Sequence, residues 1–165
     1  MYKSILLFLL AAFAFSRAAS QNVQLNILTR NSGEVNQGEI VFLEVTICNT
    51  SSSVTVPVYK LRPQINFPAA MVNVPDTGNV LPAGWKIISS TEGILRLSNG
   101  TDAIPARECR TILIAMHAKA IGGPSTIMGN LLFSNGSAPG SESGSATPGD
   151  SPADNASAST IKVLK

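Results

Sequence analysis

The sequence contains a single histidine, which excludes a cupredoxin-like copper centre. Such a centre needs two histidines together with a cysteine and usually a methionine. His117, even with Met116 or Met128 beside it, cannot complete that set. His117 also falls on the outward parity of an expected strand, where a lone histidine is most often a surface residue. We therefore expect no resident metal and no cofactor.

Motifs for known catalytic chemistry are also missing. The chain has no P-loop, dinucleotide fingerprint, HExxH zinc motif or G-x-S-x-G nucleophile elbow. The best candidate pair of carboxylates, Asp150 and Asp154, has no apolar pocket around it in the sequence that would suit it to acid–base work. We therefore expect no catalytic residues and predict that the protein is not an enzyme.

Long apolar runs are confined to the first 20 residues. Lys3 precedes an apolar run from Ile5 to Phe15, and small residues follow up to Ser20. This pattern predicts a secretory signal peptide over residues 1–20, cleaved after Ser20. The alternative is a transmembrane anchor, but the run falls short of the roughly 20 residues needed to cross a bilayer. We therefore expect a secreted or cell-surface protein with no membrane insertion after removal of the leader.

The charge of the chain is close to balanced. The full sequence has 12 Lys and Arg against 10 Asp and Glu, and the leader removes Lys3 and Arg17, so 12 − 2 = 10 basic residues remain. A net charge near zero gives no electrostatic case for binding nucleic acid or an anionic membrane. Other surface or secreted proteins, or further copies of the chain, are the expected partners.

Short runs of alternating apolar and polar residues, separated by Gly, Pro, Asn and Ser, predict an all-β protein. Within the second run, Val41, Leu43, Val45 and Ile47 share one face. Pro57 indicates an edge strand for the third run. We expect seven to eight strands in an immunoglobulin-like Greek-key β-sandwich. The expected strands lie within residues 22–29, 38–48, 53–61, 80–89, 93–98, 108–118, 125–134 and 159–165.

A low-complexity segment covers residues 134–155, close to the end of the chain. Ile161 and Val163 alternate with Lys162 after this segment, as in a strand with one buried face. We therefore interpret residues 134–155 as a long flexible loop that joins the last two strands of a single domain, 21–165. The alternative is a disordered tail after Phe133, with the final alternation arising by chance.

The two cysteines are expected to form one disulfide, because an exported chain meets an oxidising environment. Cys48 ends one expected strand and Cys109 begins another, both on the outward parity. If these strands are antiparallel neighbours, the two thiols meet at the same end of one sheet face. The alternative is two unrelated free thiols.

Two places in the sequence could contact a ligand. Asp150, Asp154 and Asn155 offer oxygen atoms to calcium, although their spacing departs from the regular calcium-loop pattern and also suits a plain Asx-turn. Trp85, the only tryptophan, could stack on a sugar, although a tryptophan in this setting more often packs into the core.

Four Asn-X-Ser/Thr sequons occur, and each would be a candidate glycan site only in a eukaryotic secretory pathway. They begin at Asn49, Asn99, Asn135 and Asn155.

The order of several short motifs resembles the DUF11-type immunoglobulin-like domains of bacterial surface proteins, in the form common in Bacteroidota. These motifs are the opening strands that end at Asn49, a P-x-G-W stretch that ends at Trp85, an E-C-R stretch around Cys109, a Gly-Gly pair before a strand, and Asp154-Asn155 before the last strand. The resemblance implies a spacer, adhesive or assembly unit without catalytic residues. The chain departs from the usual pattern because it holds one module without repeats.

The sequence therefore predicts a secreted, non-catalytic structural or interaction module for cell-surface assembly or adhesion. The alternative function is a ligand-binding module, for carbohydrate or calcium, that uses loops at one end of the sandwich.

Overall fold

A computed structural model describes residues 21–134, 143–144 and 149–165. The predicted leader, part of the predicted loop and the sequon at Asn135 lie outside the described residues. Within the described part of the chain, no helix has the length and hydropathy needed to cross a bilayer.

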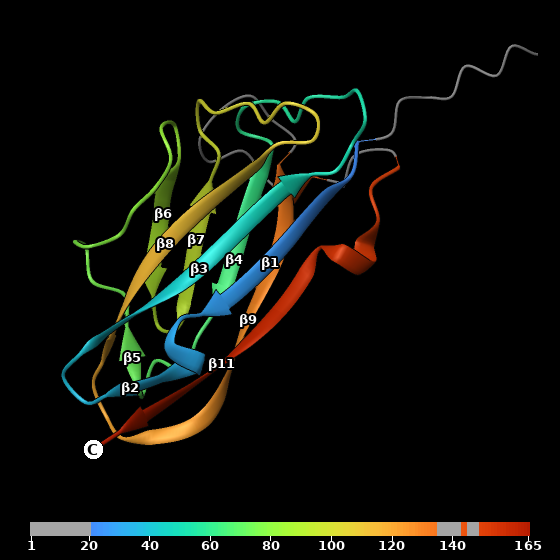
Figure 1. The fold of residues 1–165 in the computed structure, drawn as a ribbon. Coiled ribbons are helices and arrows are strands. Elements are labelled where there is room, and N and C mark those ends of the chain that lie inside the picture. Colours follow the sequence, from blue (N-terminus) through green and yellow to red (C-terminus); the bar gives the residue numbers. More distant parts are fainter. Residues whose placement is uncertain (1–20, 135–142, 145–148) are drawn as a thin grey trace, which may run out of the picture.

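Two antiparallel sheets pack face to face (Figure 1). Sheet A has the spatial order β1 (Val23–Thr29), β3 (Ile40–Asn49), β8 (Cys109–Ala118) and β5 (Val72–Asn73). Sheet B has the order β2 (Glu34–Asn36), β11 (Ala156–Leu164), β9 (Gly122–Ser134), β4 (Leu61–Asn66), β7 (Ile94–Ser98) and β6 (Lys86–Thr91). The short strand β10 (Ser143–Gly144) pairs with β9. Among the pairings of the described strands, β2–β11 alone is parallel.

Eight of the described strands have five or more residues, which agrees with the predicted number of seven to eight. Seven of them match predicted runs, whereas β4 was not predicted beyond Leu61. Two short 3₁₀ segments, η1 (Asn31–Gly33) and η2 (Pro152–Asp154), are the helical elements of the described chain. The predicted all-β, immunoglobulin-like sandwich is therefore confirmed.

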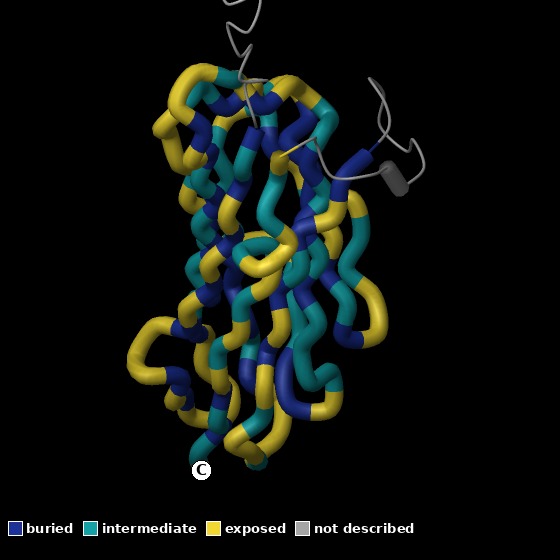
Figure 2. The backbone as a smooth tube through the Cα atoms, turned by 90° about the vertical axis from the view of Figure 1, so that its right-hand side faces the viewer, coloured by how far each residue is buried: buried dark blue, intermediate teal, exposed yellow. Residues whose placement is uncertain are grey.

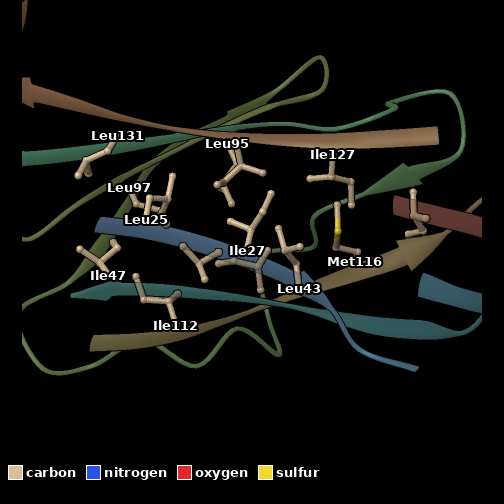
Figure 3. Packing of buried hydrophobic residues seen from close by; sticks show 14 of the residues in the cluster. Leu25, Ile27, Leu43, Ile47, Leu95, Leu97, Ile112, Met116, Ile127 and Leu131 are labelled. Carbon is tan, nitrogen blue, oxygen red and sulfur yellow. The ribbon is translucent and has the colours of Figure 1, made fainter. Parts of the chain in front are cut away.

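The core lies between the two sheets and follows the predicted parity. Val41, Leu43, Val45 and Ile47 are all at most 1% exposed, and buried positions alternate with more exposed ones along the strands (Figure 2). Aliphatic side chains of β1, β3 and β8 meet those of β7 and β9 across the interior (Figure 3). Each such side chain contributes about 1.5–3 kcal/mol when fully buried.

Gly129 allows the two sheets to approach each other at the centre of this core. A Cβ atom at Gly129 would lie 3.0 Å from Cγ2 of Ile27 and 3.1 Å from Cδ2 of Leu25. A larger residue at this inward position of β9 would push β1 away, because cores are packed too tightly to absorb extra atoms.

The prediction of a strand over residues 53–61 is wrong for most of these residues. Only Val56 forms an isolated bridge, with Ile104, and regular pairing starts at Leu61. Pro57 therefore lies in a loop and not on an edge strand.

Two buried asparagines explain this loop, because their side chains bind backbone groups that a strand would have paired. Asn49 donates from Nδ2 to the carbonyl oxygens of Val54 (2.7 Å) and Ile104 (2.9 Å). Asn99 donates from Nδ2 to the carbonyl oxygen of Pro57 (2.8 Å) and accepts from the Leu61 N–H (2.9 Å).

The end of the chain forms strand β11, which pairs with β9 as the sequence predicts. Ile161 and Val163 are 0% and 2% exposed. The alternative of a disordered tail after Phe133 therefore fails for residues 156–164. The flexibility of the 134–155 segment stays a prediction, as does the single-domain assignment for 21–165.

The predicted disulfide between Cys48 and Cys109 is present. The two residues are direct partners in the β3–β8 register, with a Cα–Cα distance of 4.0 Å. The parity argument succeeds because β3 and β8 are antiparallel neighbours over their full length.

Candidate interaction surface

Trp85 is a core residue and does not offer a stacking platform. Its side chain is 6% exposed, and its Nε1 donates a 2.7 Å hydrogen bond to Oδ2 of Asp102. The alternative that Trp85 packs into the core therefore holds. The interpretation that Trp85 stacks on a sugar loses its support.

Asp102 connects Trp85 to β8, because its carboxylate also forms an ion pair with Arg110 of β8 through two hydrogen bonds. Arg110 donates from Nε to Oδ2 (2.8 Å) and from Nη2 to Oδ1 (3.2 Å) of Asp102, and its Nη1 contacts Glu108 at 2.9 Å. The hydrogen bonds with Asp102, and then with Glu108, raise the pKa of Arg110 above its ordinary value. The network holds the loop before β8 in place, and nothing in it marks a reacting group.

The predicted ligand-contact residues near the end of the chain lie together, against the start of β1. Asp150 accepts from the Val23 N–H (3.0 Å) and from Asn155 Nδ2 (2.6 Å). Asn22 donates from Nδ2 to Asp154 Oδ2 (3.0 Å). These contacts fasten η2 to β1, and calcium binding at this place stays a prediction. Among the described residues, no three His, Cys, Asp or Glu side chains gather to hold a metal ion.

His117 lies half-buried on the outer face of β8, with its Nδ1 3.3 Å from Oδ1 of Asn73. Two surface hollows, of about 210 and 240 Å³, lie near Phe67 and near Val35. Both are smaller than the roughly 300–1,000 Å³ of typical small-molecule sites. Neither hollow therefore has the size of a typical small-molecule site.

The sequons at Asn49 and Asn99 cannot accept a glycan in the folded chain. Both side chains are at most 1% exposed, and each Nδ2 atom already donates two hydrogen bonds. Asn155 uses its Nδ2 on Asp150. These three asparagines therefore act as internal structural contacts.

The free edge of β1 is covered by side chains of β11. The Ile27 N–H donates to Ser157 Oγ (3.1 Å) and the Thr29 N–H donates to Ser159 Oγ (2.9 Å). We call these two contacts the serine seam. An uncovered edge strand invites pairing with another chain, so the seam removes β1 as a place for strand addition.

We predict that the double variant Ser157→Ala/Ser159→Ala loses about 2 kcal/mol of stability, since it leaves two N–H donors without acceptors. It should also aggregate more readily on concentration, because the β1 edge becomes open. Urea unfolding and light scattering measure the two effects. Ser89→Ala/Ser90→Ala on β6 is the matched control. Equal behaviour of the two double variants would contradict the role of the seam.

The outer face of sheet A carries exposed apolar side chains on neighbouring strands. Leu28, Ile40 and Val80 are 56%, 50% and 57% exposed, and Phe42 and Leu113 are half-buried beside them. The β1–β3–β8 register aligns Leu28 with Leu113 across β3, and Val80 bridges to Leu113. We call these five residues the apolar face of sheet A.

This face also carries one pair of opposite charges, which sum to no net charge. Arg30 and Glu44 form a 3.0 Å ion pair with side chains that are 48% and 31% exposed. The apolar face of sheet A was not predicted from the alternation of Val41, Leu43, Val45 and Ile47, which concerns only the inward side of β3. The signal was the run Ile40–Phe42, which continues to Leu43 and places apolar residues on both parities of the strand.

No family model matches the chain, and no curated protein matches it either. Membership of the DUF11-type family therefore stays a prediction.

Solved structures do resemble the fold. A cohesin module from a Clostridium perfringens family 33 glycoside hydrolase is 10% identical, with a TM-score of 0.53, over 88% of this chain and 97% of that chain. A CARDB domain from Pyrococcus furiosus, solved with di-metal ions, is 8% identical over 88% of this chain and 90% of that chain, with a TM-score of 0.46.

A Nocardia farcinica protein described as having an immunoglobulin-like fold is 12% identical over 83% of this chain and 98% of that chain, with a TM-score of 0.43. At these identities the likeness concerns the fold alone. The fold itself, an immunoglobulin-like β-sandwich, follows from the arrangement of the two sheets, and the likeness to the cohesin module agrees with it.

Proposed function

We propose that this chain is a secreted or cell-surface interaction module without catalytic activity, which assembles through the apolar face of sheet A. The observation that carries the proposal is the exposure of Leu28, Ile40 and Val80 on one sheet face. Exposed apolar residues that gather on one face, here around the Arg30–Glu44 pair, are typical of protein interaction sites. The disulfide fits an oxidising location outside the cell.

The occupant of this face is a second copy of the chain. The Arg30–Glu44 pair leaves the face without net charge, so two copies can approach without repulsion. A two-fold axis through the face would also place Arg30 of each copy near Glu44 of its mate, as self-complementary interfaces require. The likeness to a cohesin module supports a role in protein–protein contact, because the name of that module refers to such contact.

We predict that the exported protein has twice the chain mass by light scattering at micromolar concentration. Leu28→Arg/Val80→Arg should give a monomer with unchanged thermal stability, because both side chains are more than half exposed. Ile121→Arg, which changes an equally exposed residue in a loop, should stay dimeric. A wild-type protein that remains monomeric at all concentrations would overturn the dimer.

A further inference from the structure

Sheet B differs from sheet A in charge. Strands β11, β9, β4, β7 and β6 contain no Asp or Glu, although the chain has 10 of these residues. The same five strands contain four basic residues, namely Arg62, Lys86, Arg96 and Lys162. These five strands are therefore cationic, whereas nearby carboxylates belong to Glu34 on the edge strand β2 and to Glu92 in the turn between β6 and β7.

The outward positions of β4, β7 and β9 form a flat row of polar groups. Gln64 pairs with Arg96 on one side and with Asn130 on the other. Arg96 donates from Nε to Gln64 Oε1 at 3.1 Å, which orients the exposed guanidinium without neutralising it. Lys86 is exposed on the neighbouring strand β6.

The other two basic residues contribute less to this face. Lys162 forms a 3.1 Å ion pair with Glu34 near the β2 edge, and Arg62 is half-buried on β4. Arg96 and Lys86 are therefore the cations that this face presents to a partner.

Two exposed apolar side chains accompany these charges. Met128 and Leu132 are 50% and 42% exposed on the outer side of β9, and Met128 pairs in register with Asn66 of β4. Arginine and methionine are enriched at protein interfaces. Sugar and single-stranded nucleic-acid sites usually have aromatic stacking surfaces, and strands β4, β6, β7 and β11 contain no aromatic residue.

We propose that the outer face of sheet B, over β9, β4, β7 and β6, docks a protein partner with an acidic surface. Arg96 and Lys86 meet its carboxylates, and Met128 and Leu132 pack against apolar groups between them. Complementary charge of this kind speeds association and selects partners. This face is opposite to the apolar face of sheet A, so the two surfaces can be occupied at once.

The test uses the exported protein and a fluorescent peptide of alternating Glu and Leu as the acidic probe. Anisotropy titrations in low and high salt should show binding that weakens as salt screens the charges. Arg96→Glu/Lys86→Glu should weaken binding at least tenfold, and Met128→Ser should weaken it about threefold. Arg107→Glu/Lys165→Glu makes the same change in net charge at exposed positions outside β9, β4, β7 and β6, and should leave binding unchanged.

Three outcomes would overturn the proposal. The first is an equal loss in the control pair, which would mean that net charge alone drives binding. The second is tighter binding of dextran sulfate than of the peptide, with no effect of Met128→Ser, which would indicate a polysaccharide. The third is salt-sensitive polymerisation of the chain alone through this face, which would make a further copy the partner. Leu28→Arg/Val80→Arg should bind the peptide normally, so a failure here is distinct from a failure of the proposed dimer.

Discussion

Replacing Asn99 with alanine is expected to lower the free energy of unfolding by about 3 kcal/mol. Asn99 is 0% exposed. Its Oδ1 accepts from the Leu61 N–H at 2.9 Å, and its Nδ2 donates to the carbonyl oxygens of Pro57 and Asp102, both at 2.8 Å. Alanine removes this partner from the buried Leu61 N–H and from two part-buried carbonyl groups, and a buried unsatisfied group costs about 1–3 kcal/mol.

Urea unfolding measures this loss, and Asn26→Ala is the matched control. Asn26 is exposed on β1 and has one 3.3 Å contact with Ser157, so its replacement should cost no more than about 0.5 kcal/mol. Similar losses in the two variants would show that Asn99 does not hold the 57–61 segment. A large loss of stability in the Asn99 variant alone would confirm that this one side chain holds the backbone in place where it enters β4.

Removing the disulfide should have the largest effect on stability. Cys48→Ser/Cys109→Ser releases a closed loop with a sequence separation of 61, and chain entropy then predicts a loss of about 4 kcal/mol. The unfolded chain gains this freedom, while the folded β3–β8 pairing can persist without the bridge.

Chemical unfolding with and without reductant tests this expectation. Cys109 is exposed and Cys48 half-buried, so reductant should reach the bridge in the native protein. Reduced wild type should then match the double serine variant, and the variant should not respond to reductant. A loss of stability below about 1 kcal/mol would mean that other contacts keep Cys48 and Cys109 close together in the reduced, unfolded chain.

Parity alone predicted much of the fold. Val41, Leu43 and Val45 are buried because period-two alternation leaves one face of β3 dry. Cys48 and Cys109 meet because equal parity on antiparallel neighbours places them on one face.

The remaining features depend on contacts between distant residues. The 53–61 run has the composition of a strand, but Asn49 and Asn99 take its backbone groups, and Asn99 is 42 positions from Pro57. The candidate faces also depend on such contacts. The run Ile40–Phe42 places apolar residues on the outward parity of β3, but only the pairing of β1, β3 and β8 shows which outward side chains of other strands lie beside them.

The serine seam has a consequence for how the chain folds. Ile27 and Ser157 are 130 positions apart. The edge of β1 therefore stays uncovered until β11 has folded against it. Contacts of such high sequence separation slow folding, and an open strand edge favours misassembly in the meantime. During synthesis, β1 is therefore made well before the two serines that cover its edge, and the sandwich closes only once β11 has been made.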